Sequence, residues 1–191
     1  MQTKILIIDH NDSFTFNLVQ LFEEIQDVEV NVLNVGNFDL NMCSSYDAIV
    51  LSPGPGLPQD YPAVYELLKK FYTLKPILGI CLGLQHIVHF FGGALYNLDS
   101  VQHGKQSAIF LLAEDVLFKN IQQPVLAGLY HSWAAAKNKF PDCLEITSQT
   151  AEGVVMALRH KKYPISAVQF HPESYMTPNG KQMLENWVKV L

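Results

Sequence analysis

The sequence predicts an α/β fold built on an open, mixed sheet, and three observations support this. In the first half of the chain, short apolar runs alternate with segments whose apolar residues recur at helical spacing. One of these runs leads into a stretch dense in Pro and Gly, at the carboxyl end of a strand, where open α/β sheets bind their ligands. After Gly93 the segments are β-rich and too closely spaced for crossover helices, which predicts hairpins or a mixed sheet attached to a parallel core.

Composition limits both the number of domains and the class of partner. The chain has 191 residues, of which 49% are hydrophobic and 16% charged. Such a chain suits one compact domain that buries roughly 70% of its unfolded surface, so we expect a single domain over residues 1–191. The net charge of −5, without a basic run, gives no electrostatic support for binding to nucleic acid or to an anionic membrane. We expect neither a secretory signal nor a membrane span, because no apolar run approaches the ~18 residues that a span needs.

Cysteine usage points to a reducing compartment. The three cysteines, Cys43, Cys81 and Cys143, are odd in number and form no Cys-x-x-Cys pair. This pattern argues against a disulfide framework and against a structural zinc site. We therefore expect a cytoplasmic protein.

The first elements alternate between strand and helix. Residues 4–8 are a continuous apolar run typical of a buried strand. Asp12 or Ser13 is suited to cap the helix that follows. Residues 28–32 alternate as a second strand, and residues 48–51 are expected to form a third.

The remaining elements follow from the same signals. Residues 52–56 read Ser-Pro-Gly-Pro-Gly, a composition that predicts a stiff loop. Helices are expected where apolar residues recur on one face, at residues 64–71, after Cys81, and at residues 181–191. The expected strands of the second half are residues 108–112, 125–130, 144–147, 154–158 and 165–170.

Cys81 stands in a Gly-x-Cys-x-Gly frame between an apolar run and a helical pattern, with Gly79 and Gly83 on either side. This is the thiol counterpart of a nucleophile elbow, in which a tight strand-to-helix turn exposes one side chain. The unpaired N–H groups of the first helical turn and the helix dipole would favour the thiolate. The alternative is a structural cysteine at a strand end, with glycines that serve packing.

His171 and Glu173 supply what a cysteine nucleophile needs. His171 follows a predicted strand, and Glu173 is placed to accept its Nδ1 proton, which leaves Nε2 facing Cys81. The alternative is a strand-end histidine beside a surface carboxylate. A triad in the order Cys, His, Glu differs from the order nucleophile, acid, histidine of the α/β-hydrolases. An oxyanion hole is expected from the backbone N–H of Leu82 and one N–H of the Pro-Gly loop.

Two further histidines, His86 and His89, follow Cys81 in the same helical segment. They lie off its apolar face, so we expect them to be solvated or hydrogen-bonded. As a metal pair they lack a third ligand, and we expect no metal site.

Two segments together carry a family resemblance. Gly-Ile-Cys-Leu-Gly-Leu-Gln at residues 79–85 and Gln-Phe-His-Pro-Glu-Ser at residues 169–174 resemble the signatures of the class I, or triad, glutamine amidotransferases. Residues 9–17, 52–56, 103–105 and 130–132 are similar to the glutaminase subunits of anthranilate synthase and p-aminobenzoate synthase. The chain departs from this pattern at His10, where Asn is commoner, at Trp133, where a smaller apolar residue is usual, and at Tyr175 and Met176, where aliphatic residues are usual.

The resemblance implies a fold, a reaction and a set of residues. The implied fold is a three-layer, flavodoxin-like sheet with helices on both faces and the elbow at a strand end. The implied reaction is hydrolysis of glutamine through a Cys81 thioester, with His171 as acid and base and Glu173 orienting it. Glutamine and the oxyanion would contact Gly54, Pro55, Gly56, Leu82, Gln85, Ser132 and Trp133. Coupling to a partner would involve His103, Gly104 and Lys105.

The implied partner is a chorismate-using synthase subunit that receives ammonia. This chain has no phosphate loop and no second domain for activating an acceptor, which agrees with such a division of labour. No cofactor is expected in this subunit, whereas Mg²⁺ is expected in the synthase. The motifs do not distinguish an anthranilate synthase from an aminodeoxychorismate synthase or from a subunit shared by both. A stand-alone cysteine hydrolase or peptidase, and a non-catalytic binding module, are the other classes considered.

Overall fold

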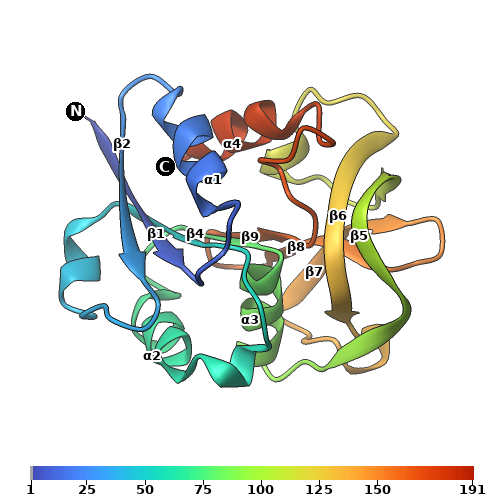
Figure 1. Ribbon diagram of the computed structural model, residues 1–191, viewed down its shortest axis with the longest axis horizontal. Coiled ribbons are helices and arrows are strands. Elements are labelled where there is room, and N and C mark those ends of the chain that lie inside the picture. The colour runs from blue at the N-terminus through green and yellow to red at the C-terminus, as the bar shows by residue number, and fades with distance from the viewer. Residues whose placement is uncertain (1) are drawn as a thin grey trace.

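A computed structural model describes residues 2–191 as three layers around one mixed sheet (Figure 1). The strands are β1 (Thr3–Asp9), β2 (Val28–Asn34), β3 (Ala48–Leu51), β4 (Ile77–Ile80), β5 (Leu95–Leu111), β6 (Val125–Ala135), β7 (Leu144–Thr150), β8 (Val155–His160) and β9 (Ile165–Val168). The helices are α1 (Thr15–Glu23), α2 (Pro62–Phe71), α3 (Leu82–Phe90) and α4 (Gly180–Val188). Short 3₁₀ helices are η1 (Met42–Ser45), η2 (Pro58–Asp60), η3 (Val116–Phe118) and η4 (Lys137–Lys139).

The sheet has the order β2-β1-β3-β4-β9-β8-β7-β5-β6. Its first five strands are parallel, in the arrangement of a flavodoxin-like core. Helices α1 and α4 cover one face and α2 and α3 the other, as Figure 1 shows. Because both faces are covered, every residue of β3, β4 and β9 is buried, which explains why these strands consist mostly of apolar residues. The predicted α/β class, with an open mixed sheet and helices on both faces, is confirmed.

The second half of the sheet is antiparallel, as the close spacing of its segments predicts. Strand β9 pairs in parallel with β4 on one side and antiparallel with β8 on the other, so it joins the two halves. Strand β5 is much longer than expected, at 17 residues. Its first part was missed because residues 95–107 are largely exposed and lack an apolar alternation. Register shifts, one of them beside Gly104 at φ 64°, also interrupt the periodicity by which strands are recognised in a sequence.

Helix α1 begins later than the sequence suggests. Its N-cap position is Phe14, which makes no side-chain cap. The Asp12 carboxylate instead accepts the Phe14 N–H at 2.8 Å, and Asp9 accepts the Thr15 hydroxyl at 2.7 Å. The prediction that Asp12 or Ser13 caps α1 was therefore wrong, since Asp12 stabilises the turn before the helix.

Two apolar cores lie on the two faces of the sheet. Phe22 of α1 packs edge-on against Trp187 of α4, with ring centroids 6.1 Å apart, in the core on one face. Leu67 of α2 and Leu84 of α3 belong to the core on the other. Burial of a side chain of this size stabilises the fold by about 2–3 kcal/mol, so both helix layers are held firmly against the strands that carry the site. No helix within residues 2–191 is both long enough and apolar enough to cross a membrane.

Candidate active site

Cys81 occupies the sharp turn between β4 and α3. Its backbone has φ 53° and ψ −101°, a conformation that residues with a side chain rarely adopt. The Cys81 N–H donates to the carbonyl of Val168 on β9 at 2.8 Å, so the turn is anchored to the neighbouring strand. The predicted elbow at a strand end is confirmed, and the thiol lies directly before the free N–H groups of the α3 first turn.

The glycines on either side of Cys81 leave no room for a side chain. A Cβ at Gly79 would lie 2.6 Å from the carbonyl carbon of Gly83, and a Cβ at Gly83 would lie 2.4 Å from the carbonyl oxygen of Leu51. Helix α3 therefore packs directly on the ends of β3 and β4. This close approach is the physical reason for the Gly-x-Cys-x-Gly frame.

His171 and Glu173 form a buried pair at the end of the segment that follows β9. Nδ1 of His171 lies 2.6 Å from Oε1 of Glu173, and both side chains are almost completely buried. Burial alone would lower the pKa of His171, but the Cys81 thiolate and the Glu173 carboxylate beside it raise that pKa well above the usual value. Nε2 of His171 has no hydrogen-bond partner within residues 2–191. The free Nε2 is thus available to a reacting group beside Cys81.

Backbone contacts hold His171 in place. Its N–H donates to the carbonyl of Gly128 on β6 at 3.0 Å, and its carbonyl accepts the Thr177 hydroxyl at 2.6 Å. Tyr130 of β6 and Phe14 pack edge-on against the imidazole, at 4.9 and 5.4 Å between ring centroids. The imidazole is therefore fixed by β6 and by the residue that precedes α1.

The Pro-Gly loop lies against the start of α3. A Cβ at Gly54 would lie 3.1 Å from Cδ2 of Leu82. Gly56 has φ 78°, in the region that favours glycine. The loop leaves β3, which neighbours β4, so the carboxyl ends of both strands bring Gly54, Pro55 and Gly56 close to Leu82. This is the arrangement expected of two sources of oxyanion donors.

Gln85 reaches the same region from one turn along α3. Its Nε2 donates to the carbonyl of Trp133 at 3.1 Å and lies 3.3 Å from Oε1 of Gln169. Nε2 of Gln169 in turn lies 3.6 Å from the Cys81 sulfur. Gln169 was not among the predicted site residues, although it stands two positions before His171 on the face of the chain that turns toward Cys81. That alternation is the signal that would have found it.

The residues of β5 and β6 are placed around the triad. Ser132 and Trp133 are partly buried on β6, next to the Gln85 side chain. His103 packs edge-on against Tyr130 at 5.5 Å, and Tyr130 contacts His171, so an aromatic stack connects His103 to the triad. Gly104 and Lys105 are exposed on β5. The structure thus brings His103 toward the triad but leaves Lys105 at the surface.

The prediction for His86 was wrong. His86 is buried and stacks on His10, with ring centroids 5.0 Å apart, whereas His89 is exposed as expected. His10 comes from the end of β1, far away in the sequence, so helical periodicity alone gave no sign of this contact. No group of three His, Cys, Asp or Glu side chains in the described part of the chain has the arrangement of a metal site.

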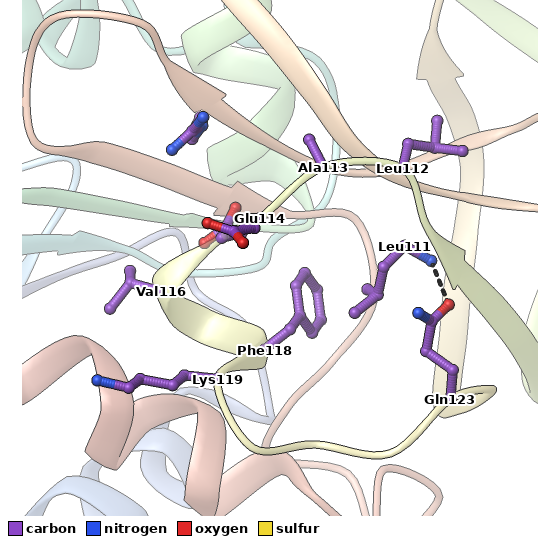
Figure 2. Close-up of a pocket in the computed structure, with 10 residues that line it drawn as sticks. Leu111, Leu112, Ala113, Glu114, Val116, Phe118, Lys119 and Gln123 are labelled. Carbon is purple, nitrogen blue, oxygen red and sulfur yellow. Dashed lines mark hydrogen bonds between the residues drawn. The ribbon is translucent and has the colours of Figure 1, made fainter.

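A hollow lies beside η3, away from the Cys81 elbow. It has a volume of about 850 Å³ and is lined by the segment from Leu111 to Lys119, together with Gln123 and Arg159 (Figure 2). Arg159 of β8 pairs with Ser166 near the start of β9, whereas Cys81 bonds to the end of β9. The buried Asp115 there accepts the Leu117 N–H at 3.0 Å and the Thr147 hydroxyl at 2.8 Å. Both its oxygens are used to hold η3, so we assign this carboxylate to structure.

Comparisons with known proteins agree with the site. Residues 6–191 match the family glutamine amidotransferase class-I. The chain is 47% identical to the "Putative anthranilate synthase component II" of Haemophilus influenzae, over 98% of this chain and 96% of the relative. It is 40% identical to the "Aminodeoxychorismate/anthranilate synthase component 2" of Bacillus subtilis, over 97% and 95% of the two chains.

The fold has a close counterpart among solved structures. The crystal structure of a GMP synthase subunit from Thermoplasma acidophilum, described there as putative, superposes with a TM-score of 0.89 at 23% identity, covering 100% of this chain and 94% of that one. This likeness concerns the fold alone. Together, the match over nearly the whole sequence and the elbow geometry establish that the chain belongs to the class I glutamine amidotransferases.

Proposed function

We propose that this chain is the glutaminase subunit of an anthranilate synthase, which hydrolyses glutamine and delivers ammonia to a chorismate-using synthase subunit. One observation carries the proposal above all others. The Cys81 elbow lies beside His171, whose Nδ1 is bonded to Glu173 at 2.6 Å and whose Nε2 has no hydrogen-bond partner among the described residues. A buried thiol, an imidazole and an orienting carboxylate are the groups that acyl transfer through a thioester requires.

In the first half-reaction the Cys81 thiolate attacks the side-chain carboxamide carbon of glutamine. The C–N bond then breaks, and ammonia leaves with a proton from Nε2 of His171. The oxyanion that forms in between would be stabilised by the N–H of Leu82 and by an N–H of the Gly54–Gly56 segment. A donor of this kind contributes ~3 kcal/mol to the barrier reduction.

In the second half-reaction water cleaves the glutamyl thioester. His171, now neutral, accepts a proton from water as the oxygen attacks, and the C–S bond breaks to release glutamate and the thiolate. Glu173 holds the imidazole in one tautomer through both steps. Thiolate, imidazole and carboxylate suffice for this cycle, and we propose that this subunit uses no cofactor.

The amino-acid end of glutamine would lie between α3 and β6. Gln85 is held at the Trp133 carbonyl and can present its Oε1 to an ammonium group, whereas Ser132 and Trp133 offer backbone groups. Pro55 would limit the movement of the loop on the opposite side. Trp133 narrows this region more than a small apolar residue would.

The synthase partner would dock where His103, Gly104 and Lys105 lie at the surface. The stack from His103 through Tyr130 to His171 supports this, because a displacement of His103 is passed on to the imidazole by direct contact. Release into bulk water would protonate ammonia, so direct delivery to the partner is required for synthesis. Cys43, Cys81 and Cys143 are free thiols, which suits the reducing cytoplasm where we place the complex.

A second assignment is the glutaminase of an aminodeoxychorismate synthase, or a subunit that serves both synthases. The Bacillus subtilis relative supports this second assignment, because its name includes both aminodeoxychorismate synthase and anthranilate synthase. Reconstitution with each candidate synthase, chorismate and glutamine, followed by identification of the aromatic product, decides between the pathways.

Replacement of the nucleophile tests the proposal itself. In the reconstituted complex, Cys81→Ser is expected to abolish glutamine-dependent formation of the aromatic product and to leave ammonia-dependent formation unchanged. Product formation is measured with either nitrogen source at saturating chorismate. Equal loss of both activities would contradict the division of labour, because Cys81 would then be required for the synthase reaction or for folding.

A further inference from the structure

A cluster of three aromatic side chains lies behind the Pro-Gly loop. It consists of His10, after β1, Tyr61, before α2, and His86 of α3, which we call the ring cluster. The rings of His10 and His86 stack at 5.0 Å with an interplanar angle of 29°. Tyr61 stands edge-on to both, at 5.0 and 5.9 Å. Three separate elements thus meet at one point beneath residues 52–56.

The hydrogen bonds of Ser52 determine the tautomer of His10. The Ser52 hydroxyl donates its only hydrogen to the carbonyl of Pro53 at 2.7 Å. Its oxygen then serves as an acceptor for the His10 backbone N–H at 3.0 Å and for Nδ1 of the His10 ring at 3.2 Å. The contact with Nδ1 is favourable only if Nδ1 carries a hydrogen, so the neutral form of His10 is the tautomer in which Nε2 is unprotonated.

The surroundings of His10 keep it neutral. The side chain is fully buried, and Nε2 has no hydrogen-bond partner within residues 2–191. Burial lowers the pKa of His10 to about 4, although Asp9 and Ser52 oppose this shift. His86, also buried and stacked on His10, has its pKa lowered to about 3. Two neutral rings can therefore stack here at physiological pH.

The ring cluster contacts the loop at two successive residues, Gly54 and Pro55. A Cβ at Gly54 would lie only 2.3 Å from Cβ of His10, so the backbone there rests directly on His10. The same Cβ would lie 3.1 Å from Cδ2 of Leu82, the residue after Cys81, so Gly54 is packed against His10 and Leu82 together. One residue further on, the Tyr61 hydroxyl donates to the carbonyl of Pro55 at 2.9 Å. The peptide groups between Gly54 and Gly56 consequently have little freedom to move relative to the elbow.

We propose that His10 is a positioning residue, which sets the backbone of the Gly54–Gly56 segment at the distance from Cys81 that the oxyanion requires. The inference rests on the proposed glutaminase reaction and adds a residue to it. His10 does not touch substrate; it acts through Ser52 and Gly54. Tyr61 supports the same segment from the far side through Pro55.

Two substitutions at His10 separate its donor from its bulk. In His10→Asn the side-chain Nδ2 is attached to Cγ, as Nδ1 is in histidine, and can donate to Ser52. His10→Leu keeps an apolar side chain of comparable size but removes the donor. We expect kcat for glutamine hydrolysis to fall about 10- to 100-fold in His10→Leu, less than the 10²–10³ that follows removal of a whole oxyanion donor. The KM for glutamine should stay within about threefold, and His10→Asn should retain kcat within about threefold of wild type.

The rate of alkylation by iodoacetamide distinguishes a positioning role of His10 from a general structural role, because a structural defect at the elbow would lower the alkylation rate together with kcat. The thiolate displaces iodide directly, without forming an oxyanion, so the rate reports the reactivity of Cys81 but not the donors of the loop. We expect His10→Leu to alkylate Cys81 at the wild-type rate while its kcat falls. Unchanged kcat in folded His10→Leu, or a parallel loss of kcat and alkylation rate, would overturn the proposal.

If His10→Leu does not fold, Tyr61→Phe provides a second test of how residues 54–56 are held in place. This variant removes only the hydroxyl on Pro55, and we expect a fall in kcat of about 3- to 10-fold with unchanged alkylation. An unchanged kcat would then overturn the proposal. All variants are assayed as the full chain, alone and with the synthase. If the wild-type chain hydrolyses no glutamine in either form, the proposed function fails, and that outcome is distinct from any result at His10.

Discussion

Two buried carboxylates, Asp115 beside η3 and Glu173 beside His171, have different surroundings. Asp115 accepts two hydrogen bonds, one on each oxygen, and holds the turn of η3. Glu173 uses Oε1 for His171, while its Oε2 has no hydrogen-bond partner within residues 2–191. Burial of a polar atom without a partner costs about 1–3 kcal/mol, so the Glu173 region is less stable than its packing would allow. Unused hydrogen-bonding capacity therefore distinguishes the carboxylate that orients His171 from the carboxylate that holds η3.

Most of the other buried side-chain nitrogen and oxygen atoms without a hydrogen-bond partner belong to histidines. In the described part of the chain they belong to His10, His86, His131 and His171 in addition to Glu173, with Ser148 as the exception. His171 lies beside Cys81, and His10 and His86 stack on each other behind the Pro-Gly loop, whereas His131 lines a separate hollow with Leu129 and Met156. The hollow shown in Figure 2 has a volume of about 850 Å³, yet both oxygens of Asp115 beside it accept hydrogen bonds.

The largest effect is expected at His171. His171→Asn removes Nε2, the group that protonates ammonia and activates water, and should slow glutamine hydrolysis by ~10³ or more. Steady-state glutamate release measures the effect, and ammonia-dependent synthesis by the complex serves as the control. Glutaminase turnover at the wild-type rate would exclude His171 as acid and base.

Matched amide substitutions at the two carboxylates should affect different quantities, kcat at Glu173 and the free energy of unfolding at Asp115. Glu173→Gln keeps the shape but removes the charge that stabilises the imidazolium, so kcat should fall about 10²-fold. Asp115→Asn replaces one acceptor oxygen by an NH₂ group facing a donor. It should lower the free energy of unfolding by about 1–3 kcal/mol and leave kcat unchanged.

Urea unfolding and glutamine turnover, measured on both variants, check this pair. If Asp115→Asn reduced kcat tenfold at unchanged stability, the hollow in Figure 2 would have to be considered part of the catalytic machinery. If Glu173→Gln lost stability but kept its kcat, Glu173 would be a structural carboxylate and would not orient His171 for catalysis.

The smallest effect is expected in the pH dependence of the free energy of unfolding, which arises from the buried histidines His10, His86 and His131. Burial lowers the pKa of His10 and His131 to about 4 and that of His86 to about 3, from 6.5 in the unfolded chain. Between pH 6.5 and about 4 the unfolded chain binds protons that the folded chain does not, so the free energy of unfolding falls as the pH falls. Each histidine contributes a slope of up to about 1.4 kcal/mol per pH unit.

Urea denaturation at pH 7.5, 6.5 and 5.5 measures this slope before most carboxylates titrate. A His86→Gln variant should show a shallower slope than wild type. The same slope in both would mean that His86 is not kept neutral by burial.

Sequence reasoning predicted the parts of the fold and the site that depend on local patterns. Strands β3, β4 and β9 consist mostly of apolar residues because both faces of the sheet are covered, and the glycines around Cys81 are required by close packing. His171 and Glu173 are two residues apart, so their pairing was evident. Their catalytic roles stay predictions until the variants are measured.

Contacts between distant segments escaped prediction for physical reasons. Gln169 meets the Cys81 sulfur across 88 positions of sequence, through the register of β4 and β9. His86 is buried because His10 reaches it from another strand, which no helical periodicity reveals. The first part of β5 is exposed, so it lacks the apolar alternation that identifies a strand.

The position of β9 in the sheet has a consequence for the protein during its synthesis. Strand β9 inserts between β4 and β8, and it carries His171 to Cys81 only after most of the chain has been translated. A ribosome-bound chain that has exposed the β4 to α3 turn therefore has the Cys81 thiol but not yet the imidazole beside it. Under the proposed mechanism such a chain would not hydrolyse glutamine, because the strand pairing that brings in β9 also brings in His171.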